Sequence, residues 1–286
     1  MNKELLSIEE KEYYFDALIN QKDIADYKLR YIWGKLPKKI YRYRTLASEH
    51  TLNNLKNNQI RLSIPSQFND PFDSFINMGV EDIFERNLDK EKFSLLTPIE
   101  QKAIRNSIKM EQKFCNNDMK KFRDAWVVGC FSEHKDDILM WSHYGDYHKG
   151  ICVEYSFEDI ASMENMYFLP ILYQNKWKSM SEIDFKLEKG YRNILKLMCT
   201  KAKCWEYEKE WRIIKRYENA ELSETGMMLS IPRPTAIYIG CNIENMDDKD
   251  KYKIDYLKII AANKGIPIYN MIMSAKEYKL EVKKER

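Results

Sequence analysis

The sequence predicts an α+β fold built around one largely antiparallel sheet. Two observations carry this prediction: short runs of apolar, β-forming residues recur along the chain, and helical periodicity is strongest near the start and toward the end. With 286 residues the chain can bury one large core or two small ones, and no shift in composition marks a boundary. We therefore expect an N-terminal helical segment at 1–35 and a single α+β domain at 36–286, with a helical insertion at 81–124.

The first strand is expected at Ile40–Arg44, after the helical pattern of residues 4–33 ends near Pro37. Alternation places Arg42 and Arg44 on one face of this strand and the intervening tyrosines on the other. Ser48 begins a helix that runs through residue 56, and a second strand follows at 59–64. Turn-forming residues occupy 65–73.

The segment 125–157 holds three of the four histidines of the chain. Apolar stretches flank a polar stretch bounded by glycines, which predicts a strand at 126–132, a helix at 136–144, a turn at 145–150 and a strand at 151–157. This layout places histidine and aromatic side chains at one edge of the sheet. The segment therefore marks the first candidate site.

The remaining elements follow the same patterns. We expect strands at 166–173, 205–215, 227–231 and 236–241, and a helix at 184–199 with an apolar stripe. A helix at 247–264 should end at Gly265, before a last strand at 266–273.

The overall charge is nearly balanced, because 47 basic and 44 acidic residues leave a formal charge of +3. Strong nonspecific attraction to nucleic acid or to an anionic membrane is not expected. No run of about 18 apolar residues predicts a membrane span, so we expect a soluble cytoplasmic protein. The six cysteines form no CxxC pair, which favours reduced thiols in the core.

Glu210 is the candidate catalytic residue. If 205–215 is a strand, its aromatic residues share one face, while Glu206, Glu208, Glu210 and Arg212 share the other. One interpretation is a solvated face screened by neighbouring cations. The other is that Glu210 points into a cleft, where it orients a sugar hydroxyl or stabilises developing positive charge, with the neighbouring Arg212 best placed to hold its geometry.

Arg42, Arg44 and Ser63 are the candidate anion-binding residues. A guanidinium on the inward face of a strand needs an anion, and its planar fork suits a carboxylate or a diphosphate. An internal ion pair with one of the glutamates at 206–210 is the alternative, and both can hold at once.

The histidines allow three interpretations. His143 could contact a substrate together with Trp141 and Tyr144, or the histidines could hold the turn at 145–150. The third is a metal site formed by His143, His148 and a Cys or Asp, but this spacing fits no standard zinc pattern, so no metal is expected. A nucleophilic triad is not supported, because there is no GxSxG motif and no Cys stands beside a His and an acid in a recognisable order.

Five blocks of this sequence, in this order, resemble a widespread bacterial family known as a domain of unknown function. They are YRYR at 41–44, FNDPFD at 68–73, CFSE at 130–133, MWSHYGD at 140–146 with His148 and Gly150, and YEKEWR at 207–212. The resemblance covers roughly residues 38–280 and implies no reaction.

A second resemblance implies a reaction. A first strand with Arg, a second strand that ends in a turn with Ser, and a late strand with Glu are similar to the layout of ADP-ribosyltransferases. The resemblance implies that Arg42 or Arg44 binds the diphosphate or ribose of NAD, that Ser63 supports the nicotinamide side, and that Glu210 is catalytic. The segment from Trp141 to His148 has no counterpart in that layout.

The sequence therefore leaves three functional hypotheses. The first is an NAD-consuming transferase or glycohydrolase, a defence or toxin effector that modifies an unknown macromolecular acceptor. The second is a noncatalytic domain that binds a nucleotide-type small molecule or a partner. The third is a metal-dependent hydrolase or nuclease that uses His143 and His148. A catalytic Glu210 must face the same cleft as Arg42 or Arg44.

Overall fold

The computed structural model describes residues 6–19, 27–74, 89–176, 194–217 and 226–284. These residues form an α+β fold, as predicted. The main sheet has eight strands: β1 (Lys39–Arg44), β3 (Trp126–Ser132), β4 (Ile151–Ser156), β5 (Tyr167–Pro170), β8 (Glu210–Arg216), β10 (Ala236–Ile239), β11 (Ile268–Met273) and β12 (Leu280–Lys284). Their spatial order is β12-β11-β10-β4-β1-β3-β8-β5. β10 and β11 run parallel, whereas β1 pairs antiparallel with both β3 and β4.

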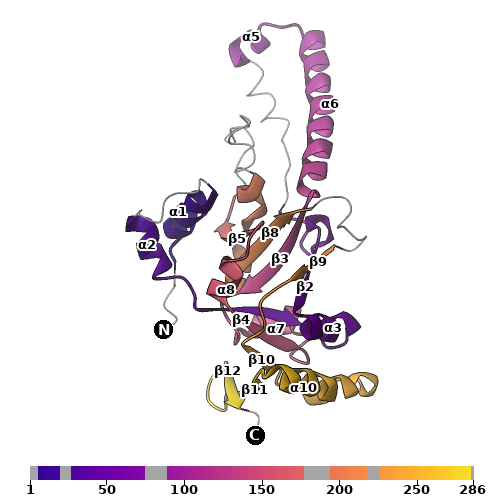
Figure 1. The fold of residues 1–286 in the computed structure, drawn as a ribbon. Helices are drawn as coiled ribbons and strands as arrows, with labels where there is room; N and C mark the ends of the chain where they lie inside the picture. The colour runs from indigo at the N-terminus through magenta and orange to yellow at the C-terminus, as the bar shows by residue number, and fades with distance from the viewer. Residues whose placement is uncertain (1–5, 20–26, 75–88, 177–193, 218–225, 285–286) are drawn as a thin grey trace. The chain divides into compact units, whose positions relative to one another are not determined.

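The chain divides into two compact units, of which the larger comprises Met1–Ser63, Val127–Ile171 and Cys204–Arg286. Beside the main sheet it contains a two-stranded sheet of β2 (Gln59–Leu62) and β9 (Met227–Ser230). Its α-helices are α1 (Ile8–Ile19), α2 (Tyr27–Trp33), α3 (Glu49–Asn57), α7 (Ile138–Tyr144), α8 (Phe157–Ala161) and α10 (Tyr252–Lys264). α3 and α10 pack side by side (Figure 1). Gly265 ends α10 in the left-handed conformation, as the sequence predicts.

The smaller unit comprises Ile64–Trp126 and Leu172–Lys203. It contains the 3₁₀ turn η1 (Pro65–Gln67), α5 (Lys90–Ser94), α6 (Pro98–Arg123) and the parallel strands β6 (Leu172–Gln174) and β7 (Thr200–Ala202). α5 and α6 fall within the expected insertion at 81–124. Of the helix expected at 184–199, residues 194–198 are helical, residue 199 lies in a turn, and 184–193 lie outside the described residues. Asp73 of the FNDPFD block is buried and forms an ion pair with Lys201, with 3.4 Å between Oδ2 and Nζ.

The two faces of the main sheet carry different chemistry. One, here called the tyrosine face, presents Tyr41 and Tyr43 of β1, and both pack in a buried cluster with Trp141 of α7. The other, here called the Arg42 face, presents Arg42, whose guanidinium lies over the Phe131 ring with 5.5 Å between Cζ and the ring centroid. Aromatic rings on the Arg42 face pack against one another in pairs, with 4.7–5.9 Å between centroids. They belong to Phe131, Tyr155, Phe157, Phe168 and Trp211.

Three predicted strands differ clearly from the structure. The strand expected at 166–173 is wrong as a single element, because β5 ends at Pro170 and β6 starts at Leu172 in a different sheet. The strand expected at 205–215 is wrong in its first half, where η3 (Lys203–Glu208) is a 3₁₀ helix, and β8 starts only at Glu210. Lys209 separates the two with a left-handed φ of 42°, a backbone state that alternating side chains do not reveal. The strand expected at 151–157 ends at Ser156, whose hydroxyl accepts a hydrogen bond from the Asp159 N–H and thereby caps α8. The strand β12 was not predicted.

Candidate functional site

Helix α7 is capped at its start and packs against the sheet through its middle. Asp137 caps the helix by accepting a hydrogen bond of 2.9 Å from the Met140 N–H. Trp141 is fully buried, donates from Nε1 to the Lys135 carbonyl at 2.7 Å, and meets Tyr43 edge to face, with 5.3 Å between centroids. Trp141, predicted to contact ligand, is therefore a core residue that sets the direction of the rest of the helix.

His143 lies on the last turn of α7 and is exposed. Its Nδ1 lies 2.9 Å from the Tyr207 hydroxyl oxygen. Three aromatic rings surround it, those of Tyr144, Trp205 and Tyr207, with centroids 6.0–6.2 Å from the imidazole and interplanar angles of 71–76°. Each of these aromatic side chains is partly exposed. We call these four residues the His143 cluster.

A buried carboxylate, that of Glu208, is hydrogen-bonded to the His143 cluster. Glu208 is 3% exposed and accepts a 2.7 Å hydrogen bond from the Tyr144 hydroxyl to its Oε1. The Ser132 hydroxyl of β3 donates to the Glu208 carbonyl oxygen, also at 2.7 Å. These two bonds attach η3 to α7 and to the main sheet, so the position of Glu208 is fixed from both sides.

Glu210, the predicted catalytic residue, is held in a buried ion pair. It is 3% exposed, and its Oε1 and Oε2 lie 2.6 and 3.2 Å from Nε and Nη2 of Arg212, which is fully buried. This bidentate arrangement fixes the carboxylate and shields its charge. Arg212 therefore holds Glu210, as the sequence predicts.

Glu210 and the predicted NAD-binding arginines lie on opposite faces of the sheet. Trp211 packs among the rings of the Arg42 face, so its strand neighbours Glu210 and Arg212 point to the tyrosine face. Arg42 and Arg44 alternate with Tyr43 and therefore point the other way. Glu210 and these arginines consequently do not line one cleft.

Arg42 is 5% exposed, and its Nη2 donates to the Arg61 carbonyl at 2.7 Å. Within the described residues its Nε and Nη1 are buried without a hydrogen-bond partner. Arg44 is exposed at the end of β1. Ser63, the third predicted binding residue, pairs through its backbone with Val128, with N–O distances of 2.8 and 2.9 Å in the two directions.

A second buried carboxylate, Glu154 of β4, belongs to the tyrosine face. It accepts hydrogen bonds from Lys39 Nζ at 2.5 Å, from the Tyr238 hydroxyl at 2.7 Å and from the Thr235 hydroxyl at 2.8 Å. Burial alone would raise its pKa, but these three donors more than offset burial and lower the pKa below its ordinary value. Glu154 is therefore a satisfied structural anion that joins β1, β4 and β10.

The structure does not gather His143 and His148 as metal ligands. His143 bonds to Tyr207, whereas His148 bonds to the Ser142 hydroxyl, with 3.1 Å between Nε2 and Oγ. No group of three His, Cys, Asp or Glu side chains suited to holding a metal ion occurs in the part of the chain that the structure describes. His134 contributes its carbonyl oxygen, which accepts a 2.7 Å hydrogen bond from the Tyr43 hydroxyl.

Comparison with known proteins finds one match. A family model described as "Protein of unknown function (DUF2971)" matches residues 140–213. No curated protein and no solved structure matches the chain. The matched segment begins in α7 and ends in β8, so it contains the whole His143 cluster together with Glu208 and Glu210. Of the helices described, none is both long and apolar enough to cross a membrane.

Sequence reasoning found half of the cluster and missed how it is completed. Its candidates included His143 and Tyr144, but Trp205 and Tyr207 were placed on one strand face with Trp211, and Glu208 was grouped with Glu210. The available signal was the block at 207–212, which puts a tyrosine and two carboxylates within four residues. The backbone turn at Lys209 separates them, and no local pattern predicts that turn.

Proposed function

We propose that the protein binds a nucleotide-type small molecule at the His143 cluster. The observation that carries this proposal is the arrangement of Tyr144, Trp205 and Tyr207 around one exposed imidazole, with all three rings partly exposed. Partly exposed aromatic rings stack on nucleobases, and each such contact contributes about 1–3 kcal/mol. The flat, aromatic half of a nucleotide fits this surface.

Polar groups in the cluster would orient a bound nucleotide, which stacking alone does not do. The bond between Tyr207 and His143 Nδ1 fixes the imidazole plane, and Nε2 is then the ring nitrogen free to face a ligand. Glu208 holds Tyr144 in place through its hydroxyl. A base amino group or a ribose hydroxyl would find these polar atoms at the edge of the stacking surface.

The test is a titration with nucleotides followed by tryptophan fluorescence. ATP, GTP and NAD should quench the emission, and Trp205→Ala should raise the Kd about tenfold or more, because one stacking partner is lost. Trp33→Phe is the matched control, since Trp33 is a partly exposed tryptophan of α2 outside the cluster. Equal affinity in the wild type and Trp205→Ala, or no quenching at millimolar concentration, would remove the proposal.

A second candidate function, NAD cleavage, is favoured by the carboxylate next to the cluster. Loss of nicotinamide from NAD develops positive charge on the ribose, which a nearby carboxylate stabilises. Glu208 is hydrogen-bonded to Tyr144 of the cluster, whereas Glu210 lies on the strand that follows and pairs with Arg212. This candidate therefore keeps the reaction expected from the sequence but transfers the catalytic role to Glu208.

Nicotinamide release separates the two candidates. If NAD is cleaved, Glu208→Gln should abolish release, while Glu208→Asp should retain part of it. Nucleotide binding without nicotinamide release by the wild type would leave a noncatalytic binding domain.

A further inference from the structure

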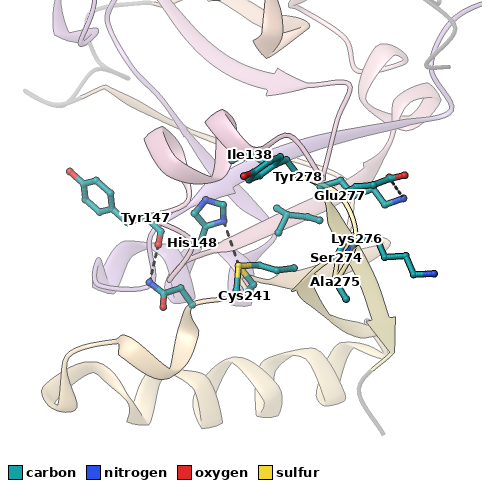
Figure 2. Close-up of a pocket in the computed structure, with 13 residues that line it drawn as sticks. Ile138, Tyr147, His148, Cys241, Ser274, Ala275, Lys276, Glu277 and Tyr278 are labelled. Carbon is teal, nitrogen blue, oxygen red and sulfur yellow. Dashed lines mark hydrogen bonds and ion pairs between the residues drawn. The ribbon is translucent and has the colours of Figure 1, made fainter.

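A second site lies at the turn that follows α7. A pocket of about 680 Å³ is lined on one side by His148 and Cys241 and on the other by residues 273–280, the end of β11 and the loop to β12. Figure 2 shows the His148 imidazole and the Cys241 thiol pointing toward one another at the pocket wall. The distance from Cys241 Sγ to His148 Nδ1 is 3.7 Å, within hydrogen-bond range for sulfur.

The backbone around His148 is held in an unusual conformation. Asp146, Tyr147 and His148 are consecutive left-handed residues, with φ values of 53°, 52° and 67°. Such a run costs about 1–2 kcal/mol per residue and persists only where its surroundings enforce it. A Cβ on Gly240 would clash with the His148 carbonyl oxygen, so glycine there allows the chain before Cys241 to approach the turn.

The hydrogen bonds around His148 determine which of its nitrogens carries the proton. The Ser142 hydroxyl donates to the Ile138 carbonyl at 2.9 Å. Its oxygen must then accept from Nε2–H of neutral His148, at 3.1 Å. Nδ1 is consequently the unprotonated nitrogen, and it faces the Cys241 thiol. Trp141 stacks against the imidazole at an interplanar angle of 14° and fixes its plane.

We propose that Cys241 is a nucleophilic thiol for which His148 is the general base and Ser142 the positioning residue. The arrangement meets the geometric requirement for an activated nucleophile: a base within reach, itself oriented by a third group. No local sequence pattern predicts this pair, because Cys241 lies 93 residues from His148 along the chain.

The chemistry of the pocket indicates a small ester with an apolar acyl group. Ile138, Met273, Ala275 and Leu280 supply apolar walls. In the reaction, Sγ forms a bond to the carbonyl carbon while its proton passes to His148 Nδ1. The bond to the alcohol oxygen then breaks, the alcohol leaves with that proton, and an acyl thioester remains on Cys241.

Burial raises the pKa of the Cys241 thiol and lowers that of His148. Both groups are therefore neutral near pH 7, which fits proton transfer during attack rather than a preformed thiolate. The charged groups that line the same pocket are Lys276, Glu277 and Lys279, and the last two form an ion pair of 2.7 Å with each other.

The test uses p-nitrophenyl butyrate and the full-length protein. We expect a burst of one equivalent of p-nitrophenol, with mass spectrometry placing the butyryl group on Cys241. The exposed Cys204 is the internal control and should react at least about tenfold more slowly. Absence of a burst, or acylation that favours Cys204, would overturn the proposal.

Variants assign the roles. His148→Asn, chosen because asparagine tolerates a left-handed backbone, should slow acylation of Cys241 about a hundredfold. Ser142→Ala should slow it less, and Tyr252→Phe, on α10 and outside the pocket lining, should leave it unchanged. If His148→Asn fails to fold, the wild-type pH profile decides: the Cys241 rate should fall as pH drops and His148 is protonated, and it should level off once His148 is neutral. A rate that rises with pH in parallel with that of Cys204 would contradict the proposal.

Discussion

Glu208 and Glu210 stand two residues apart, are equally buried, and have different neighbours. Glu208 ends a 3₁₀ helix and bonds to a tyrosine of the His143 cluster, whereas Glu210 begins a strand and bonds to a buried arginine. Burial alone therefore does not identify a functional carboxylate. The difference lies in the partners that position each carboxylate: Glu208 accepts a hydrogen bond from a tyrosine hydroxyl of the His143 cluster, whereas Glu210 is bidentate to a buried guanidinium.

The largest expected effect is on the ion pair. Glu210→Gln should destabilise the protein by about 3–5 kcal/mol, because fully buried Arg212 loses its counter-charge. Urea unfolding monitored by circular dichroism measures the change. The paired replacement Glu210→Leu with Arg212→Met should recover much of this loss. A single variant as stable as the wild type would show that Glu210 does not compensate the arginine charge.

Glu208→Gln should cost less, about 1–2 kcal/mol, because a glutamine oxygen can still accept the hydrogen bond from Tyr144. Tyr144→Phe tests the same bond from the other side. In a double-mutant cycle by chemical denaturation, the two changes together should cost less than their sum. Strict additivity would mean that this hydrogen bond does not hold η3 against α7.

Lys209→Gly should raise stability by about 0.5–1 kcal/mol, because the left-handed φ of 42° is strained for lysine and not for glycine. Lys209→Ala is the matched control: it also removes the lysine side chain but keeps a Cβ. Thermal unfolding should rank glycine above lysine and alanine. If alanine stabilises as much as glycine, the side chain of Lys209 rather than its backbone is responsible.

The smallest effect concerns pH. Burial lowers the pKa of His148 in the folded protein below its ordinary value of 6.5. The unfolded chain therefore binds a proton at this residue at a higher pH than the folded protein does, and stability should fall as pH drops below about 6.5. The difference in unfolding free energy between wild type and His148→Asn, measured from pH 8 to 5, should shrink toward acid. A difference in unfolding free energy that stays constant from pH 8 to 5 would contradict a lowered His148 pKa in the folded protein.

Prediction from sequence succeeded where a local pattern determines the structure. The strand expected at 126–132 matches β3, and the alternation of arginine and tyrosine in β1 was correctly assigned to two faces. It failed at 205–208, because alternating aromatic and acidic residues suit a strand and the 3₁₀ helix depends on contacts with α7 and β3.

The residues of the candidate site were likewise predicted only where they lie close together in the sequence. His143 and Tyr144 are neighbours in the sequence and were found together. Their bonds to Tyr207 and Glu208 each span 64 residues, so no local pattern could have revealed them. The pairing of Glu210 with Arg212, only two residues apart, was anticipated for the same reason.

The left-handed turn at 146–148 has a consequence for natural variation. Asparagine, aspartate, histidine and glycine adopt this backbone most readily, and β-branched residues adopt it least. Valine, isoleucine and threonine should therefore be nearly absent at these three positions among homologous proteins, whatever reaction those proteins perform. At positions 146 and 147 the backbone conformation alone would limit which residue types occur. At position 148 the backbone conformation and the need for a proton-accepting nitrogen would together favour histidine.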